Sequence, residues 1–370
     1  MSKKIYILTS SRADYGIYLP LLKELKEDDQ FELRIVAFGT HVLEKYGYTL
    51  SQIQSDGFDV YKTIECPFDN DTEFGVSEAM SKIGLKFSEF WSNEKKEIDL
   101  VICLGDRFEM FSAVSAASPF NLRIAHLHGG ETTLGAIDNA FRHSISMFSS
   151  MHFCATESFK NRLIELLDDK SNIYNVGALS LDNLSSLQLL SKNEFKSKFG
   201  LEIKENTVVV TFHPETVSPE ENNKHVEVLK EYFAQSENHF IVTMPNVDTN
   251  NMIVREMFLS LQEQFPMKVN CVESLGTLGY FSLLKHSRFV FGNSSSGIIE
   301  AASFNKFVIN LGDRQKGRLS GKNVMHTPIA LHAIQKTEKF ILSQAEKEFN
   351  NPYFSGGSAK NIMAVLKRIM

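Results

Sequence analysis

The chain has 370 residues, of which 43% are hydrophobic and 23% are charged. This balance is typical of globular proteins, and the length favours two or three domains over a single core. The formal net charge of -6 argues against a general nucleic-acid-binding protein, because affinity for a phosphate backbone needs a basic surface. It leaves room for a local basic site that binds a phosphorylated small molecule.

The cysteines and the apolar runs bear on the cellular compartment. The sequence has four scattered cysteines, Cys66, Cys103, Cys154 and Cys271, and no two of them have the spacing of metal ligands. Cys103 and Cys154 lie in apolar runs, where we expect buried, inert thiols. Nothing indicates a disulfide framework, and no segment has the length of a secretory signal or a membrane span. We therefore expect a cytoplasmic protein with no membrane partner.

From the N-terminus, short β-rich apolar runs alternate with longer amphipathic runs, which is the pattern of parallel βα units. We predict a first strand at 5–8 and a helix at 18–26, in which Leu19, Leu22 and Leu25 share one face. Further strands are predicted at 33–38, 100–104, 123–127, 152–155 and 173–176. Since residues 100–104 are apolar throughout, that strand should be covered on both faces.

A second series of elements starts after a break that follows Gly177. Residues 180–200 are polar and have a helical pattern. Strands are then predicted at 207–211, 240–243, 289–291 and 307–311, and a turn at 353–357 leads to a last helix at 359–370. The chain is therefore predicted to be an α/β protein of two Rossmann-like, doubly wound domains, residues 1–180 and residues 181–355.

In open α/β sheets, ligands bind beyond the carboxyl ends of the strands, so the loops that follow the strands are the first candidates for a site. Residues 9–16 follow the first strand and place small hydroxyl residues and Arg12 at the start of a helix. Free backbone N–H groups and a guanidinium there favour a phosphate. The alternative is an ordinary helix cap, with Asp14 as the N-cap residue.

The next two loops concentrate acidic and basic side chains. The strand at 100–104 continues into Gly105-Asp106-Arg107, a carboxylate and a guanidinium side by side, which fits a functional site and a structural ion pair equally well. After the strand at 123–127, Glu131, Asp138 and Arg142 follow a pair of glycines that would let a ligand approach the backbone closely. Asp138 and Arg142 share a helix face if Asp138 begins a helix.

A pair of histidines near the same strand raises the possibility of a metal site. His126 and His128 are two residues apart, so on a strand they would share a face. No convincing set of further ligands lies nearby, although His143 follows in the next run. Acid–base or packing roles are therefore favoured, and we expect no bound metal.

The second domain carries the strongest signal. The strand at 207–211 leads to His213, a good candidate for a general acid or base. Residues 292–297, Gly-Asn-Ser-Ser-Ser-Gly, form a small hydroxyl-rich turn that should open a helix and offer donors to a pair of phosphates. Glu300 lies about one turn into that helix, where it could hold a ribose diol. The alternative is a serine-rich cap without a ligand, and Glu300 together with the later Arg314 and Arg318 counts against it.

In this order, the loops resemble those of the UDP-N-acetylglucosamine 2-epimerase family, and specifically its hydrolysing branch in bacterial sialic-acid biosynthesis. The resemblance runs along nearly the whole chain. Its motifs are Ser-Arg-Ala-Asp-Tyr-Gly (11–16), Gly-Asp-Arg (105–107), His-Gly-Gly-Glu (128–131), Ile-Asp (137–138) with Arg-His (142–143), His-Pro-Glu-Thr (213–216), Gly-Asn-Ser-Ser-Ser-Gly (292–297) and Gly-Asp-Arg-Gln-Lys-Gly-Arg (312–318). It implies a GT-B-like fold with the active site in the cleft between the domains and a C-terminal helix, 356–370, that packs back on the first domain.

The resemblance also implies a reaction, in which UDP-GlcNAc and water give N-acetylmannosamine and UDP. A base removes the C2 proton, UDP leaves by elimination, and water adds to the resulting 2-acetamidoglucal with the opposite configuration at C2. No cofactor takes part. Relatives are commonly dimers or tetramers, so a homo-oligomer is expected.

The same resemblance assigns residues by position. The acid–base set matches Asp106, Glu131, Asp138 and His213. The substrate contacts match Arg12, Arg107, Arg142, Gly177, Ser294, Ser295 and Arg314, with Glu300 at the ribose and Tyr280 against the base. Many relatives carry Glu where this chain has His128, so no catalytic role is carried over to that position, and Glu131 is the candidate for the acidic role.

Four other functions compete with this one. They are a non-hydrolysing 2-epimerase, a hydrolysing 2-epimerase for another nucleotide-sugar (a UDP-diacetamido-trideoxyhexose or a GDP-linked sugar of a legionaminic-acid pathway), a GT-B glycosyltransferase, and a regulator that binds a nucleotide-sugar without turnover. The motifs at 105–107 and 128–131 favour the hydrolysing branch. The density of acid–base groups argues against a regulator.

Overall fold

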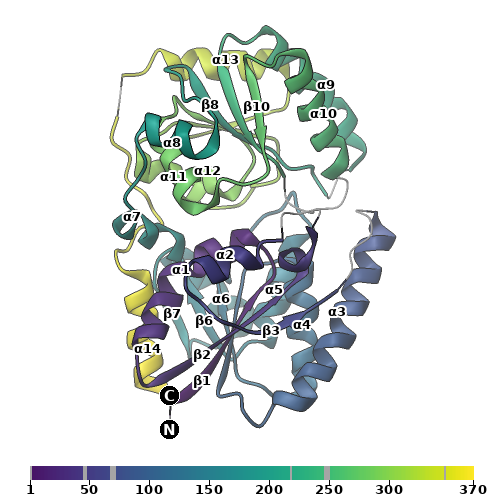
Figure 1. The fold of residues 1–370 in the computed structure, drawn as a ribbon, viewed down its shortest axis with the longest axis vertical. Helices are drawn as coiled ribbons and strands as arrows, with labels where there is room; N and C mark the ends of the chain where they lie inside the picture. The colour runs from purple at the N-terminus through teal and green to yellow at the C-terminus, as the bar shows by residue number, and fades with distance from the viewer. Residues whose placement is uncertain (1, 45–47, 67–71, 217–218, 246–250, 346) are drawn as a thin grey trace. The chain divides into compact units, whose positions relative to one another are not determined.

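The computed structural model describes residues 2–44, 48–66, 72–216, 219–245, 251–345 and 347–370. Contacts divide the chain into two compact units, each built on its own sheet (Figure 1). Unit 1 comprises Met1–Glu131, Asp138–Ser186 and Tyr353–Met370, and unit 2 comprises Thr132–Ile137 and Leu187–Pro352. In the described part of the chain, no helix is long and apolar enough to cross a membrane.

Unit 1 contains a seven-stranded parallel sheet in the order β3-β2-β1-β4-β5-β6-β7. Its strands are β1 (Lys3–Thr9), β2 (Phe31–Phe38), β3 (Val60–Ile64), β4 (Leu100–Leu104), β5 (Ile124–Leu127), β6 (Met151–Cys154) and β7 (Ile173–Asn175). Its helices are α1 (Arg12–Glu27), α2 (Leu50–Ser55), α3 (Glu73–Glu94), α4 (Phe108–Ala117), α5 (Asp138–Phe148), α6 (Glu157–Leu167), α7 (Asn183–Ser186) and α14 (Ser358–Ile369), with short 3-10 turns at Gly39–Val42, Ser118–Phe120 and Leu179–Asp182.

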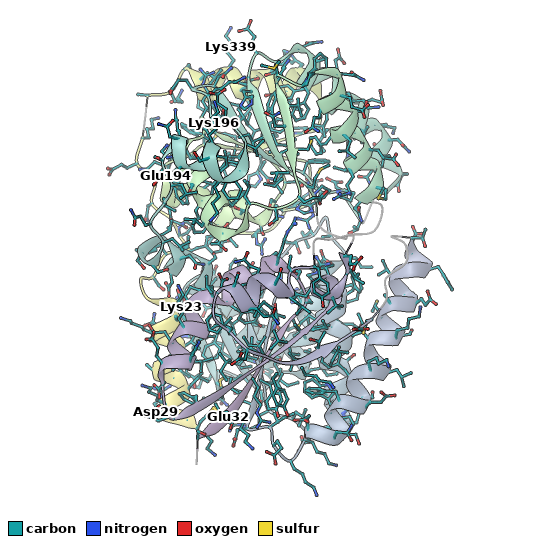
Figure 2. The ribbon with its side chains drawn as sticks, viewed as in Figure 1. Lys23, Asp29, Glu32, Glu194, Lys196 and Lys339 are labelled. Carbon is teal, nitrogen blue, oxygen red and sulfur yellow. The ribbon has the colours of Figure 1, made fainter. Side chains whose placement is uncertain are left out.

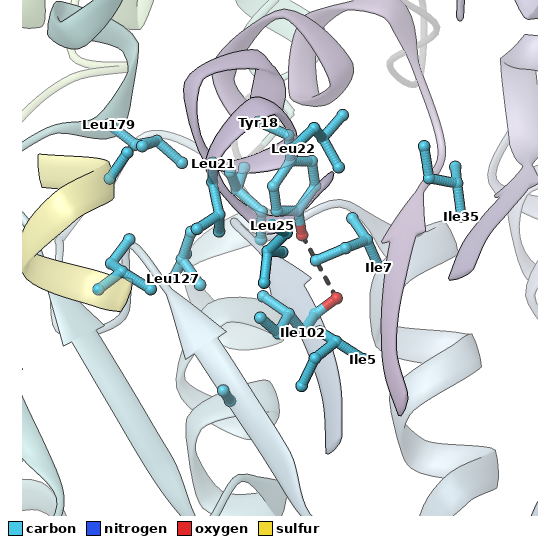
Figure 3. Close-up of a cluster of buried hydrophobic side chains, with 14 of the residues drawn as sticks. Ile5, Ile7, Tyr18, Leu21, Leu22, Leu25, Ile35, Ile102, Leu127 and Leu179 are labelled. Atoms are coloured by element: carbon cyan, nitrogen blue, oxygen red, sulfur yellow. Dashed lines mark hydrogen bonds between the residues drawn. The ribbon is translucent and has the colours of Figure 1, made fainter. Parts of the chain in front are cut away.

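One face of this sheet is covered by α1 and α14. Leu21, Leu22 and Leu25 of α1 pack on alternate residues of β1, β2 and β4, and Tyr18 donates a hydrogen bond to the backbone oxygen of Ile102 at 3.5 Å (Figure 3). The helix is amphipathic, because Lys23 on its other face is exposed (Figure 2). Its buried leucines follow the spacing that predicted the helix, and removing them from water stabilises the unit.

The opposite face of the same sheet packs on α3 and α4. Phe38, on the face of β2 opposite to Ile35 and Ala37, meets Phe87 of α3 edge to face, with ring centroids 4.8 Å apart. Trp91 is fully buried and donates from Nε1 to the backbone oxygen of Ala113 on α4 at 3.0 Å. Covering both faces leaves β4 wholly buried, as its unbroken apolar sequence predicted.

Unit 2 contains a six-stranded parallel sheet in the order β10-β9-β8-β11-β12-β13. Its strands are β8 (Thr207–Thr211), β9 (His239–Thr243), β10 (Val269–Val272), β11 (Val290–Gly292), β12 (Val308–Leu311) and β13 (Val324–Thr327). Its helices are α8 (Lys192–Phe199), α9 (Asn222–Gln235), α10 (Asn251–Gln264), α11 (Gly276–His286), α12 (Ser295–Ile299) and α13 (Leu331–Leu342), with 3-10 turns at Pro219–Glu221 and Ala301–Phe304. Tyr232 of α9 stacks on Phe291 of β11 with centroids 4.8 Å apart, at the centre of a core that α9, α10 and α13 share with the strands.

The structure corrects the sequence prediction in two places. Three strands, β3, β10 and β13, were not predicted, and all three lie at sheet edges, where polar and half-exposed side chains break the apolar pattern. The predicted helical stretch at 180–200 is interrupted, since no helix covers residues 187–191. Ser191 ends that break as the N-cap of α8, in a capping box with Glu194.

Candidate active site

Both sheets reverse their strand order at one place, which is where doubly wound folds bind ligands. In unit 1 the reversal lies between β1 and β4, and in unit 2 it lies between β8 and β11. The segments directly after the carboxyl ends of these strands contain Asp106, His213 and Ser294, and Arg12 as the first residue of α1. Each unit therefore presents predicted site residues at its own reversal point.

In the loop after β1, the backbone donors are hydrogen-bonded to the carboxylate of Asp14. Asp14, which is buried, accepts hydrogen bonds from the backbone N of Ser10 and of Ser11 at 2.7 Å each, and from both serine hydroxyls at 2.9 and 3.0 Å. The N-cap of α1 is Ser11 and not Asp14, and the two residues form a capping box. The expectation that free N–H donors of this loop bind a phosphate is therefore wrong for Ser10 and Ser11. Arg12, the first residue of α1, is half-buried and keeps its predicted role as a proposal.

Asp106 and Arg107 each bond another residue. Arg142, which is only 2% exposed, donates to a carboxylate oxygen of Asp106. Arg107 makes two hydrogen bonds to Glu109, at 3.1 and 2.8 Å. Burial raises the pKa of Glu109 and the Arg107 guanidinium opposes that rise. Asp138 begins helix α5, which meets the condition under which Asp138 and Arg142 were expected to share a helix face. The same helix places Arg142 against Asp106.

His126 is buried and neutral, and both of its ring nitrogens are hydrogen-bonded within the protein. Its Nε2 lies 2.8 Å from the backbone oxygen of Gly105, which can only accept, so Nε2 carries the proton and Nδ1 accepts from the Ser146 hydroxyl at 2.9 Å. Burial lowers the pKa of His126 to about 3. Its bond to Gly105 fixes the backbone directly before Asp106.

His128 leaves the strand on which His126 lies. Strand β5 ends at Leu127, and the φ angle of His128 is 64°, in the left-handed region. The expectation that both histidines share a strand face is therefore wrong. The Nδ1 atom of His128 lies 2.7 Å from Oε1 of Glu131, a carboxylate with no exposed surface. Among the described residues, no group of three or more His, Cys, Asp or Glu side chains could hold a metal ion.

The six residues between Glu131 and Asp138 group with unit 2. Leu134 donates from its backbone N to the oxygen of Lys316 at 3.0 Å, and Ile137 donates to the Thr216 hydroxyl at 3.0 Å. Gly135 is required there, because a Cβ atom would lie 2.5 Å from the backbone oxygen of Asp313. This segment was placed in the first predicted domain, as part of residues 1–180.

In unit 2, one asparagine ties the two strands of the reversal point together. Asn293, directly after β11, accepts from the backbone N of His213 at 2.7 Å and donates to its backbone oxygen at 2.8 Å. Gly292 has a φ angle of 135°, and a Cβ atom there would lie 2.0 Å from the backbone oxygen of Thr211. The two hydrogen bonds and the close approach hold His213 at a defined place beyond the end of β8.

The serine-rich turn opens a helix, as predicted. Ser294 is the N-cap of α12 and accepts from the backbone N of Ser296, so Ser295 is the first helical residue. The Ser296 hydroxyl donates to the Tyr280 oxygen at 2.8 Å, and burial raises the pKa of Tyr280. Glu300, almost buried, ends α12 one turn later.

Residues in the loop after β12 also bond Asn293. Arg314 and Gln315 both donate to the backbone oxygen of Asn293, at 3.3 and 2.9 Å. Glu215 accepts from the backbone N of Asp313 at 2.9 Å. No functional role was assigned to Asn293, Gln315 or Glu215 from the sequence, although all three lie within the quoted motifs.

Gly177, a predicted substrate contact, has a structural explanation of its own. Its φ angle is 88°, and a Cβ atom would lie 1.9 Å from the Ser355 hydroxyl oxygen. Ser355 donates to the backbone oxygen of Val176 at 2.7 Å. The glycine therefore lets the chain before α14 pack against the end of β7, and a substrate contact at Gly177 stays a prediction.

The family model described as UDP-N-acetylglucosamine 2-epimerase matches residues 23–367. The chain belongs to this family. It is 35% identical, over 99% of its length and 94% of the relative's, to the Polysialic acid biosynthesis protein P7 of Escherichia coli. It is 33% identical, over 89% of its length and 85% of the relative's, to the GDP/UDP-N,N'-diacetylbacillosamine 2-epimerase (hydrolyzing) of Campylobacter jejuni.

The fold is likewise that of the family. The UDP-GlcNAc 2-epimerase of Neisseria meningitidis, in a crystal structure bound to UDP-GlcNAc, superposes with a TM-score of 0.81 at 18% identity, covering 99% of this chain and 100% of that one. This likeness confirms the predicted GT-B-like fold of two parallel-sheet α/β domains.

Proposed function

We propose that this member of the family is a hydrolysing UDP-GlcNAc 2-epimerase that converts UDP-GlcNAc and water to N-acetylmannosamine and UDP. The observation that carries the proposal is the arrangement in unit 1, where the loops after the neighbouring strands β4 and β5 hold two carboxylates with hydrogen-bonded partners, Asp106 with Arg142 of α5 and Glu131 with His128. Inversion at C2 requires removing a proton from one face of the sugar and returning one to the other face, so it needs more than one acid–base group.

The proposed elimination breaks the C2–H bond and the C1–O bond to UDP. A base takes the C2 proton, the C–H electrons form the C1–C2 double bond, and the C1–O electrons leave with UDP. Water then adds its oxygen to C1 of the 2-acetamidoglucal while C2 receives a proton on the opposite face. The products are free N-acetylmannosamine and UDP, with no change in oxidation state.

Unit 2 offers the groups that a diphosphate leaving group needs. The start of α12 supplies the Ser294 and Ser295 hydroxyls and a helix N-terminus, and Arg314 adds a guanidinium bonded to the same Asn293. Negative charge grows on the diphosphate as UDP departs, so donors aimed there stabilise the transition state more than the ground state. We propose Glu300 for the ribose and Tyr280 for packing on the base.

A second substrate class is supported by one comparison. The Campylobacter relative is named for a GDP- or UDP-linked N,N'-diacetylbacillosamine, and its identity to this chain, 33%, is close to the 35% of the polysialic-acid protein. The chemistry at C2 would be the same for either sugar. The difference would lie in the groups at C4 and C6 and in the nucleotide base.

The test is to incubate the full chain with UDP-GlcNAc in D2O, without metal or acceptor, and to follow the products by NMR. Equal amounts of UDP and free N-acetylmannosamine carrying deuterium at C2 are expected. UDP-ManNAc without free sugar would place the chain in the non-hydrolysing branch. Inert UDP-GlcNAc with turnover of UDP- or GDP-linked N,N'-diacetylbacillosamine would establish the second substrate class.

The cytoplasmic location and the dimeric or tetrameric state stay predictions. The mass in solution, measured by light scattering, tests the second of them.

A further inference from the structure

His128 combines three features that a structural histidine does not need. It holds a left-handed φ of 64°, which is uncommon for a residue with a side chain and clusters at functional sites. Its backbone is pinned there by a hydrogen bond from its N to the oxygen of Phe153 on β6, at 3.0 Å. Its ring is turned so that Nδ1 meets Glu131 at 2.7 Å.

The bond to Glu131 sets the tautomer of His128. An ionised carboxylate only accepts hydrogen bonds, so Nδ1 carries the proton and donates it to Oε1 of Glu131. In the neutral ring this leaves the lone pair on Nε2. That atom is buried and has no hydrogen-bond partner among the described residues, although buried polar atoms are almost always paired.

His126, two residues earlier, is the internal contrast. Both of its ring nitrogens are bonded within the protein, to Gly105 and to Ser146. It carries its proton on Nε2, whereas His128 carries its own on Nδ1. Both ring nitrogens of His126 therefore have a structural partner, whereas Nε2 of His128 is left to bond a ligand.

The two members of the pair differ in burial and in their place on the sheet. Glu131 has no exposed side-chain surface, whereas the side chain of His128 is 9% exposed. His128 is also the first residue beyond β5, at the carboxyl edge of the sheet. Because a carboxylate behind an imidazole orients it and stabilises its protonated form, the pair has the arrangement of an acid–base histidine with a supporting acid.

We propose that His128 takes the C2 proton and that Glu131 acts through it as a positioning residue; this inference rests on the proposed function. The Nε2 lone pair forms the new N–H bond, the C2–H electrons form the C1–C2 double bond, and the C1–O electrons leave with UDP. The imidazolium then releases its proton to water before the next turnover. This assignment gives the proton transfer to a residue to which the family resemblance assigns no role, and makes Glu131, a member of the acid–base set that the resemblance implies, act through it.

Other titratable groups near the pair are His126 on β5, His152 and Cys154 on β6, and Glu157 and Lys160 on α6. Burial lowers the pKa of His126 to about 3 and that of His152 to about 4, and it raises the pKa of Cys154 to about 12. None of these three titrates near neutral pH. The loss of a limb near neutral pH on changing residue 128 would therefore not come from any of these three groups.

The experiment compares His128→Asn, His128→Gly, Glu131→Gln, Glu131→Asp and the double variant His128→Asn/Glu131→Gln in the full chain. Asn and Gly both accept a left-handed φ, so both variants should fold. His332→Gln, an exposed histidine of α13, is the matched control. Each protein is assayed with the nucleotide-sugar that the wild type turns over, with UDP affinity and thermal stability measured alongside.

We expect His128→Asn to lower kcat about a hundred- to ten-thousand-fold and to change the pH profile of kcat, with KM and UDP affinity little changed. Glu131→Gln should lower kcat by no more than His128→Asn does, and Glu131→Asp should keep more activity than Glu131→Gln. The double variant should have the kcat of His128→Asn alone. Free imidazole should restore turnover to His128→Gly. If His128→Asn keeps wild-type kcat, or Glu131→Gln is clearly the more damaging change, the inference is overturned while the proposed function stands. A wild type that is inert towards every nucleotide-sugar overturns both.

Discussion

The two reversal points of this protein are built from different chemistry. In unit 1 the loops beyond β1, β4 and β5 are filled by groups that carry or exchange charge, with Asp106 paired to Arg142, Arg107 to Glu109 and Glu131 to His128. In unit 2 the Asn293 amide ties the loop beyond β8 to the loop beyond β11, and Glu215 and Arg314 bond backbone groups rather than another charged side chain in the bonds described above. Two sheets with the same kind of strand-order reversal therefore carry different polar groups at their carboxyl ends.

The difference fits a division of labour in the proposed reaction. Proton transfer needs side chains whose protonation changes during turnover, and ion pairs tune such groups. A departing diphosphate needs donors that stay in place, which amides, hydroxyls and a helix N-terminus provide without titrating. Substitutions of the acid–base carboxylates of unit 1 should then lower kcat with little effect on UDP affinity, and substitutions that displace the start of α12 in unit 2 should weaken UDP binding.

The largest effect is expected for Asp106→Asn. The amide oxygen can still accept from Arg142, so the fold should survive, but the side chain can no longer exchange a proton. We expect kcat to fall about a hundred- to ten-thousand-fold with unchanged UDP affinity, measured by UDP release and by calorimetry. Asp28→Asn, at the opposite edge of unit 1 where Asp28 pairs with Lys367, is the control and should keep full activity. A matching loss of UDP affinity would contradict the division of labour.

Gly292→Ala should have the next largest effect, and on binding. The new Cβ atom would lie 2.0 Å from the backbone oxygen of Thr211, so β8 and β11 must separate where His213 and Ser294 leave them. We expect roughly ten- to a hundred-fold weaker UDP binding, since a small displacement of positioning groups has such effects. Gly200→Ala is the matched control, because its φ is also positive, at 69°, but no heavy atom lies within 4 Å of the new Cβ atom. Equal losses in both variants would show that backbone strain alone is responsible.

Asn293→Ala tests the amide bridge itself. It removes both side-chain hydrogen bonds to the backbone of His213, which should lower the free energy of unfolding by about 1–3 kcal/mol and UDP affinity by about tenfold. Asn323→Ala is the control, since Asn323 is equally buried and bonds the backbone of Lys306 at the opposite edge of the sheet. Urea denaturation should give similar losses for the two variants. Only Asn293→Ala should weaken UDP binding, and an equal effect of Asn323→Ala on binding would refute the bridge.

The sequence predicted the core strands and the places of the site residues, and missed the partners of those residues. Strands 100–104 and 207–211 were predicted with their observed bounds, because buried parallel strands are continuously apolar. Site residues could be located because they follow such strands. Edge strands such as β10 were not predicted, because most of their side chains are only half-buried and the sequence there is not continuously apolar.

Side-chain partners depend on tertiary geometry that local spacing does not contain. Asp106 is adjacent to Arg107 in sequence, yet it pairs with Arg142, thirty-six residues away. His128 follows His126 by two residues, but the strand ends between them and a left-handed residue turns the second ring towards Glu131. The bridging role of Asn293 depends on the register of β8 beside β11, which one sequence does not reveal.

The smallest expected effect concerns stability, and it again comes from unit 1. Burial lowers the pKa of His152 to about 4, whereas an unfolded histidine titrates near about 6.5. The unfolded state therefore binds more protons between these values. The contribution of His152 to stability is complete above about pH 6.5 and is lost as the pH falls towards about 4, with a slope of up to about 1.4 kcal/mol per pH unit.

His152→Gln should flatten that slope. Urea denaturation at about pH 7 and about pH 5 should show a smaller loss of unfolding free energy for His152→Gln than for the wild type. His332→Gln, which changes an exposed histidine, should leave the wild-type difference intact. His239 in unit 2 is also buried, and its pKa is lowered by burial, but a hydrogen bond to Asn270 opposes the shift. A larger flattening for His239→Gln than for His152→Gln would mean that the buried histidine of unit 2, and not that of unit 1, limits stability in acid.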